Sequence, residues 1–152
     1  MRDAANADRL IRMDKKRVLI ICTGNVARSQ MGEGLLRHFG GGRFEVFSGG
    51  LIPSYVRPNA IAVMNEIGID ISHHRSKSVN EFVGAEPFDY VITVCDHAAQ
   101  YCPTFPGDAK RIHWSIKDPV VIGDDEAQRD AFRAARDHLK SRIQEFVANE
   151  GK

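Results

Sequence analysis

A chain of 152 residues with a formal net charge of +1 and 43% hydrophobic residues has the size and composition of one globular domain with a single core. The near-neutral charge argues against a nucleic-acid-binding or membrane-surface protein, and no apolar run approaches the roughly 20 residues of a membrane-spanning helix. The three cysteines are an odd number and lack the spacing of a secreted disulfide scaffold. We therefore expect a cytoplasmic location, where cysteines are kept reduced for chemistry.

Apolar runs and amphipathic stretches alternate along the chain. The first 14 residues are polar and predict a flexible N-terminal extension, which leaves a single domain at residues 15–152. Strands are expected over residues 17–21, 44–47, 88–94 and 111–113. Helices are expected from 29 to about 40, over 58–68 and from 124 toward the C-terminus, with short helical turns over 81–83 and 96–101.

This alternation predicts an α/β fold, a three-layer sandwich in which a parallel sheet of about four strands has helices on both faces. Ligands of such sheets bind beyond the carboxyl ends of the strands, and Cys22 and Cys95 each directly follow an expected strand.

His73 and His74 are predicted to be solvated loop residues, and Trp114 is predicted to pack in the core. The apolar faces expected of the later two helices consist of Ile61, Met64 and Ile67, and of Phe132, Ala135, Leu139, Ile143 and Phe146.

The turn from the first strand into the first helix carries the clearest chemical signal. Glycine and asparagine tolerate the positive φ of a tight loop, whose backbone N–H groups can converge on an oxyanion at the helix N-terminus. The positive potential of these N–H groups also favours the thiolate of Cys22, which is the nucleophilic form. Arg28 can hold two oxygens of a tetrahedral oxyanion, and Ser29 can donate a hydrogen bond to the sulfur. A buried, inert cysteine beside an unrelated arginine is the weaker alternative. The loop reads Cys22-Thr23-Gly24-Asn25-Val26-Ala27-Arg28-Ser29.

Two further cysteines, Cys95 and Cys102, lie seven residues apart after the third expected strand. They could be structural cysteines. They could also form half of a metal site that His97 joins, although such a site needs about four ligands and a fourth is not evident. A third interpretation is a redox pair, because a cysteine at a strand end near Cys22 could attack an adduct on that residue and pass the disulfide to a second cysteine.

The segment Cys22-Thr-Gly-Asn-Val-Ala-Arg-Ser-Gln-Met-Gly-Glu-Gly34 resembles the active-site loop of the low-molecular-weight tyrosine phosphatase fold, and more closely that of thioredoxin-coupled arsenate reductases built on this fold. The spacing of Cys95 and Cys102 is similar to that of the second and third cysteines of these reductases. The resemblance extends from about Met13 to the last expected helix. It implies that residues 15–152 form one catalytic domain with a low-molecular-weight phosphatase-like fold.

Asp118 and Pro119 form a dipeptide that is common in ordinary turns, but beside Cys22 and Arg28 they resemble the general-acid loop of this family. An acid is needed because an oxide leaving arsenic or phosphorus is a poor leaving group until it is protonated. The tyrosine-containing segment that typically follows this dipeptide in the phosphatases is absent here, where Val120 and Val121 stand. This departure weakens a tyrosine-phosphatase interpretation.

The resemblance implies an arsenate reductase that uses no cofactor or metal ion. Cys22 would attack arsenic while Asp118 protonates the departing oxygen. A disulfide would then form between Cys22 and Cys95, pass to Cys95 and Cys102, and be reduced by thioredoxin, in preference to glutaredoxin. A monomer with no nucleic-acid or membrane partner is expected. Arsenate or phosphate would bind against Thr23, Gly24, Asn25, Val26, Ala27, Arg28 and Ser29.

Two other functions stay open at this point. A phosphatase acting on aryl phosphates would use only Cys22, Arg28 and Asp118, and weak phosphatase activity is expected in either case because phosphate and arsenate share shape and charge. A redox sensor without enzymatic activity would signal through Cys95 and Cys102. The ratio of arsenate reduction to phosphate-ester hydrolysis separates the first two functions.

Some arsenate reductases of this kind bind potassium next to the loop. Asn25, Glu33 and Ser48 match ligand positions of that site, but Lys77 stands where an aspartate would be expected. A lysine ammonium could take the place of the cation. We therefore predict that this protein has no potassium requirement.

Overall fold

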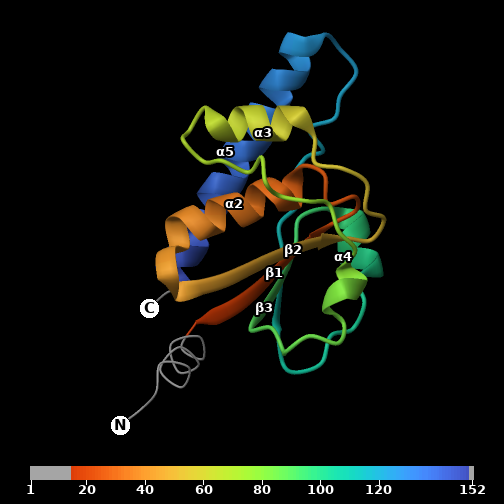
Figure 1. Ribbon diagram of the computed structural model, residues 1–152, viewed down its shortest axis with the longest axis vertical. Helices are drawn as coiled ribbons and strands as arrows, with labels where there is room; N and C mark the ends of the chain where they lie inside the picture. The colour runs from red at the N-terminus through yellow and green to blue at the C-terminus, as the bar shows by residue number, and fades with distance from the viewer. Residues whose placement is uncertain (1–14, 151–152) are drawn as a thin grey trace.

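The computed structural model describes residues 15–150 (Figure 1). The expected N-terminal extension, residues 1–14, lies outside the described residues, so the domain boundary stays a prediction. Within residues 15–150, none of the helices combines the length and apolar character that crossing a bilayer requires.

A four-stranded parallel sheet forms the centre of the molecule, as the sequence predicts. Its strands are β1 (Lys16–Cys22), β2 (Phe44–Gly50), β3 (Tyr90–Thr93) and β4 (Lys110–His113), in the order β2-β1-β3-β4. Strand β2 continues past the expected end at residue 47, because its last residues pair with β1 as far as Cys22 opposite Gly50. Strand β3 is shorter than the expected 88–94. The carboxyl ends of β1 and β3 meet at the same edge, and this places Cys22 near Cys95.

Helices cover both faces of the sheet, which confirms the three-layer architecture (Figure 1). Helices α2 and α5 pack against each other and α2 packs on β1 and β2, while α3 packs against the N-terminal half of α5. Helix α4 packs on β1 and β3, and the 3-10 helix Val79–Phe82 packs on β2. The bounds are α2 (Arg28–Gly40), α3 (Pro58–Asn65), α4 (Asp96–Tyr101) and α5 (Asp125–Glu150), with 3-10 helices at Gly41–Arg43 and Val79–Phe82.

The core contains the residues that the apolar patterns indicate, with one exception. The interior of β1 is fully buried, as both faces of this central strand are covered. All five residues predicted for the stripe of α5 are buried, Asp124 caps that helix by accepting from the N–H of Ala127 at 2.8 Å, and Trp114 is buried against Phe146. The predicted apolar stripe of α5 and the predicted packing of Trp114 are confirmed.

The exception is α3, which is shorter than predicted and presents a different face. It ends at Asn65 and not at Gly68, because the N–H of Ile69 turns back to the carbonyl of Met64 at 3.0 Å while Gly68 adopts φ 79°. The residues that it buries are Ala60, Val63 and Met64, whereas Ile61 and Ile67 are only partly buried.

Candidate active site

The sulfur of Cys22 lies inside the loop that joins β1 to α2. Cys22 is 2% exposed, and its Sγ is 2.8 Å from the hydroxyl oxygen of Ser29. The backbone N–H of Asn25 also donates to this sulfur at 3.2 Å. A hydroxyl and an N–H directed at sulfur are the contacts that stabilise a thiolate. The contact predicted between Cys22 and Ser29 is therefore present.

Asn25 holds the tight turn of this loop. It adopts φ 51°, in the left-handed region, whereas Gly24, which we expected to share that conformation, does not adopt it. The amide of Asn25 donates to the hydroxyl oxygens of Ser29 at 2.7 Å and Ser48 at 3.0 Å, and its carbonyl oxygen accepts from the N–H of Lys77 at 3.0 Å. These bonds hold the side chain while the backbone makes a turn that few residue types adopt.

The end of β2 and the segment after it support the outer side of the loop. A β-carbon on Gly50 would lie 2.7–2.8 Å from backbone atoms of Asn25, Gly24 and Thr23, so only glycine fits there. The carbonyl oxygens of the loop point outward: that of Thr23 accepts from the N–H of Ile52 at 2.8 Å, and that of Gly24 accepts from the hydroxyl of Ser76 at 2.9 Å. These supports were not predicted from the sequence, in which the paired glycines that end β2 are the only signal of such a close approach.

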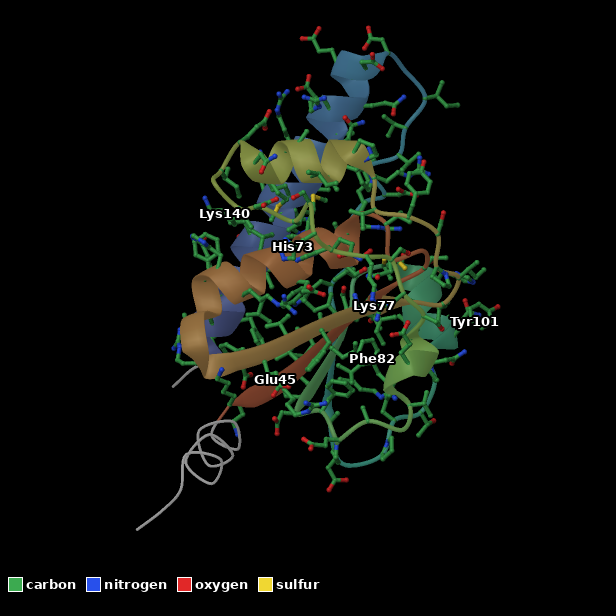
Figure 2. All side chains as sticks on the ribbon, viewed as in Figure 1. Glu45, His73, Lys77, Phe82, Tyr101 and Lys140 are labelled. Atoms are coloured by element: carbon green, nitrogen blue, oxygen red, sulfur yellow. The ribbon has the colours of Figure 1, made fainter. Side chains whose placement is uncertain are left out.

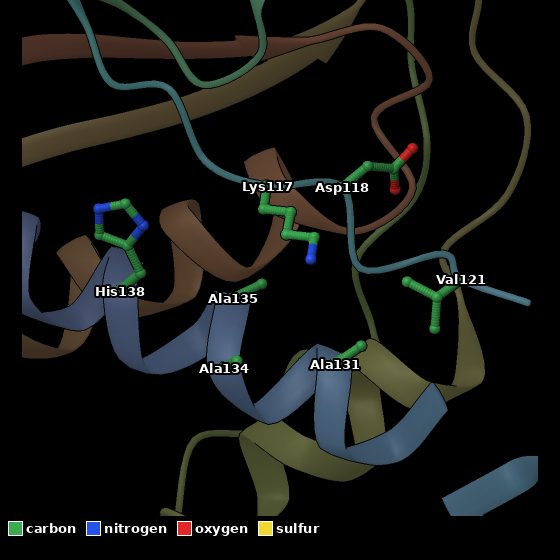
Figure 3. A pocket seen from close by; sticks show the side chains of 7 residues that line it. All are labelled: Lys117, Asp118, Val121, Ala131, Ala134, Ala135 and His138. Atoms are coloured by element: carbon green, nitrogen blue, oxygen red, sulfur yellow. The ribbon is translucent and has the colours of Figure 1, made fainter. Parts of the chain in front are cut away.

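Arg28 connects the loop to the segment that carries the predicted acid. Its Nη1 donates to the carbonyl oxygen of Ile116 at 2.9 Å, two residues before Asp118. Asp118 is exposed, and its Oδ1 accepts from the N–H of Val120 at 3.0 Å within a local turn. In Figure 3 its carboxylate points away from α5. The structure thus brings the Asp118 segment to Arg28, and its acid role stays a prediction.

A mostly apolar pocket of about 210 Å³ lies between the Asp118 turn and α5 (Figure 3). Alanine side chains of α5 line one side of the pocket, and the polar side chains of Lys117 and His138 also line it. It is lined by Lys117, Asp118, Val121, Ala131, Ala134, Ala135 and His138.

Cys95 lies beside the Cys22 loop, at the start of α4. It is 4% exposed at the position before α4, and its Sγ is 3.2 Å from the hydroxyl oxygen of Thr23 and accepts from the N–H of Ala98 at 3.4 Å. Cys102 follows the other end of α4, where it is partly exposed and Nη1 of Arg111 lies 3.4 Å from its Sγ. All three cysteines are free thiols. The structure therefore brings Cys95 to the loop and keeps Cys102 one short helix away.

His97 also contacts the loop, which our sequence analysis did not predict. Its Nδ1 lies 3.2 Å from the Thr23 hydroxyl oxygen, and its ring lies 4.8 Å from that of Tyr101. Figure 2 shows Tyr101 on the outer side of α4. The alternative role that we considered for His97 was that of a metal ligand. Within residues 15–150, no group of three or more histidine, cysteine or acidic side chains is arranged to hold a metal ion.

A buried polar cluster lies behind the loop and contains Glu33, whose side chain is 5% exposed. Its carboxylate accepts from the hydroxyl of Ser48 at 2.7 Å and lies 3.7 Å from the ammonium of Lys77. Nε2 of His74 and a guanidinium nitrogen of Arg37 lie 3.3 and 3.4 Å from its other oxygen. Several partners thus surround one buried carboxylate, which is the arrangement that a buried charge requires.

The ammonium of Lys77 lies beside Glu33 and Ser48, two of the residues that we compared with potassium ligands. It lies 3.3 Å from the hydroxyl oxygen of Ser48 and 3.4 Å from the carbonyl oxygen of Arg75, in addition to its contact with Glu33. Figure 2 shows this side chain near the carboxyl end of β2. A potassium ion would meet a fixed positive charge among the same oxygens, so these residues do not fit one. Burial lowers the pKa of Lys77, and the neighbouring Glu33 opposes this shift.

The prediction that His74 is solvated is wrong, whereas that for His73 is confirmed. The side chain of His74 is 4% exposed because its Nδ1 lies 3.0 Å from the amide oxygen of Gln30, and its Nε2 faces Glu33. Gln30 in turn donates to both carbonyl oxygens of Asn25. Burial lowers the pKa of His74, although Glu33 acts in the opposite direction. His74 is thus part of the support of the loop.

Comparison with known proteins identifies the family. The family model described as low molecular weight phosphotyrosine protein phosphatase matches residues 17–152. The chain belongs to this family. It is 41% identical to an arsenate reductase of Halalkalibacterium halodurans over 136 residues, which are 89% of this chain and 97% of the relative. It is 38% identical to the arsenate reductase of Bacillus subtilis with the same two coverages.

Solved structures give the same picture. A structure described as an arsenate reductase in the phosphate-binding state matches with a TM-score of 0.76 and 35% identity, over 88% of this chain and 97% of that chain. The thioredoxin-dependent arsenate reductase of Corynebacterium glutamicum matches with a TM-score of 0.69 and 29% identity, over 95% of this chain and 66% of that chain. The predicted fold and the resemblance to arsenate reductases on a phosphatase fold are therefore confirmed.

Proposed function

We propose that this protein is a cytoplasmic arsenate reductase that forms disulfides in sequence among Cys22, Cys95 and Cys102 and is reset by thioredoxin. The observation that carries the proposal is the position of Cys95, which is hydrogen-bonded to the Cys22 loop through Thr23 at 3.2 Å. An enzyme that only hydrolyses phosphate esters does not need a second thiol there. The arsenate reductases among its relatives and the thioredoxin-dependent neighbour support the same function.

In the first step arsenate binds to the N–H groups of the loop and to Arg28. The thiolate of Cys22 attacks arsenic, an S–As bond forms, and one As–O bond breaks. Asp118 donates the proton that lets this oxygen leave as water. The contact between Arg28 and Ile116 links the oxyanion site to the segment that carries this acid.

In the second step the sulfur of Cys95 attacks the sulfur of Cys22. The S–S bond forms as the S–As bond breaks, and its electron pair stays on arsenic, which is reduced from the +5 to the +3 state and leaves as arsenite. The position of Cys95, at the carboxyl end of the strand that neighbours β1, supports this attack.

In the third step Cys102 attacks Cys95, which releases the thiolate of Cys22. A dithiol of the thioredoxin type then reduces the disulfide between Cys95 and Cys102 by thiol–disulfide exchange. Helix α4 separates these two cysteines, and a disulfide needs Cα atoms within about 7 Å, so α4 must rearrange in this step.

Replacing the last cysteine tests the order of these steps. Cys102→Ser should still release about one arsenite per enzyme molecule and then stop as a Cys22–Cys95 disulfide, because the missing thiol is needed only after arsenite has left. Cys95→Ser should give no burst of arsenite with a thioredoxin system. Peptide mapping without reductant identifies the trapped disulfide. Repeated turnover of Cys102→Ser with thioredoxin, or the absence of the Cys22–Cys95 linkage, would contradict the proposal.

The acid role of Asp118 has its own test. Asp118→Asn should slow the chemistry at Cys22 by roughly 10²–10⁴-fold, the usual contribution of a general acid, while the affinity for phosphate changes little. Rapid-quench measurement of arsenite formation and a phosphate-binding titration give the two quantities. A variant that binds phosphate weakly and turns over normally would show that Asp118 only shapes the site.

Two other functions predict different results. An aryl phosphatase would use the loop and Asp118 without Cys95, so its phosphate-ester hydrolysis would greatly exceed its arsenate reduction. A redox sensor would form a disulfide with peroxide but release no arsenite. Measuring arsenite production with thioredoxin, with a glutaredoxin–glutathione system and with neither separates these functions and identifies the reductant.

A further inference from the structure

The hydroxyl of Thr23 lies between the thiol of Cys95 and the imidazole of His97. Its oxygen is 3.2 Å from Sγ of Cys95 and 3.2 Å from Nδ1 of His97. Thr23 belongs to the loop after β1, while the other two residues lie at the start of α4. A hydroxyl accepts one hydrogen bond while it donates another, so a continuous hydrogen-bonded path joins the sulfur to the imidazole.

Two protonation states of this path are fully hydrogen-bonded without movement of any heavy atom. In the first, the thiol donates to the Thr23 hydroxyl, which donates to Nδ1 of a neutral His97 that carries its proton on Nε2. Moving each proton one position along the path gives the second state, in which protonated His97 donates to Thr23 and Thr23 donates to the thiolate of Cys95. The N–H of Ala98, 3.4 Å from the sulfur, adds a donor that favours this second state.

We propose that His97 accepts the proton of Cys95 through Thr23 and thereby generates the thiolate that attacks the arsenic adduct on Cys22. This inference rests on the proposed arsenate reduction. The proton of Cys95 moves to His97, the electron pair left on sulfur forms the S–S bond to Cys22, and the S–As pair departs with arsenite. His97 is exposed, so it can return the proton to water. His97 touches neither the substrate nor the sulfur, and it is a positioning residue that acts through Thr23.

The groups around this path determine how easily the second state forms. Asp96, beside His97, is bound to the ring of His113 at 2.9 Å and to the hydroxyl of Ser115 at 3.0 Å, which directs its charge toward β4. The titratable or charged groups that border the path are Tyr101 and Asp96 on α4, His113 on β4, and Cys22 and Arg28 on the loop.

A direct test measures the reactivity of Cys95 without arsenate. In Cys22→Ser/Cys102→Ser the only thiol left is that of Cys95, and its alkylation by iodoacetamide is followed from about pH 6 to pH 9, where histidine and cysteine titrate. Adding His97→Gln should slow alkylation at pH 7 by about 10-fold or more, since a paired histidine promotes thiolate formation. The two rates should converge at high pH. Imidazole added to a His97→Ala variant should restore the neutral-pH rate, and His38→Gln, an exposed histidine at the end of α2, is the matched control.

The outcomes separate this inference from the proposed function. Identical pH profiles with and without His97, or equal slowing at every pH without rescue by imidazole, overturn the inference, because the second pattern indicates only a structural role. The same substitution is then placed in the Cys102→Ser background, where a slower arsenite burst at neutral pH that recovers as the pH rises supports the inference. If Cys102→Ser itself gives no burst while His97 still controls alkylation of Cys95, the proposed function fails and the proton path stands.

Discussion

The Cys22 loop and helix α4 face each other across the site but are held very differently. The loop is buried and supported from several sides, and Asn25 and Ser29 are fully enclosed. Helix α4 has only six residues, most of them exposed, and Asp96 links its first turn to β4. The residues that support the loop are Gln30, Ser48, Gly50, Ile52, Ser76 and Lys77.

The difference matches the two tasks of the proposed reaction. Binding and attack on an oxyanion need donors fixed in place before the substrate arrives, since groups that must reorganise lose their advantage. Transfer of the disulfide needs movement, because seven residues along a helix span about 10 Å, too far for a disulfide. A rigid loop and a loosely held helix therefore suit an enzyme that first binds and then passes on oxidising equivalents.

The largest expected effect comes from disturbing the rigid side. Gly50→Ala should reduce arsenate reduction and phosphate-ester hydrolysis together by at least about 10²-fold, because a β-carbon would push the loop backbone out of position. Gly42→Ala is the matched control, as a β-carbon there meets nothing within 4 Å. Steady-state rates of both reactions give the comparison, and wild-type activity of folded Gly50→Ala would show that the loop tolerates displacement.

An intermediate effect is expected at the buried cluster behind the loop. Lys77→Ser leaves Glu33 with one cation fewer, so the free energy of unfolding should fall by roughly 1–3 kcal/mol in urea titrations. The wild-type enzyme should turn over equally in potassium and sodium at equal ionic strength, whereas the variant should be partly restored by potassium. Lys110→Ser removes an exposed ion pair with Glu150 and serves as the control. A clear preference of the wild type for potassium would contradict the prediction that the ammonium of Lys77 takes the place of a bound potassium ion.

The smallest effect is expected at α4. Asp96→Asn weakens the contact with His113, so α4 should loosen more easily and the disulfide should pass from Cys22–Cys95 to Cys95–Cys102 about 2- to 5-fold faster, the size expected of an exposed ion pair. Trapping the disulfides at successive times and mapping them measures this rate. Asp130→Asn weakens a comparably exposed pair with Arg133 on α5 and should leave the rate unchanged. A slower transfer in Asp96→Asn would mean that α4 must stay ordered while the disulfide moves.

Local patterns in the sequence determined most of the fold. The buried run of β1, the stripe of α5 and the cap at Asp124 act over neighbouring residues, and their periodicity and capping preferences are visible in the chain itself. The turn at Cys22 was predictable for the same reason, since a strand, a short loop and a helix follow one another directly. The extent of α3 was not, because the packing of Ile69 and the turn at Gly68 decide where that helix stops.

Tertiary structure alone decided the surroundings of the reactive groups. Thr23 meets Cys95 and His97 across more than 70 residues of sequence, Arg28 reaches Ile116, and His74 becomes buried only because α2 passes beside its loop. Such contacts depend on which strand ends and loops the sheet order brings together, and no local pattern records them. The chemistry of Cys22 is therefore visible in one segment of sequence, whereas its partners are set by the order β2-β1-β3-β4.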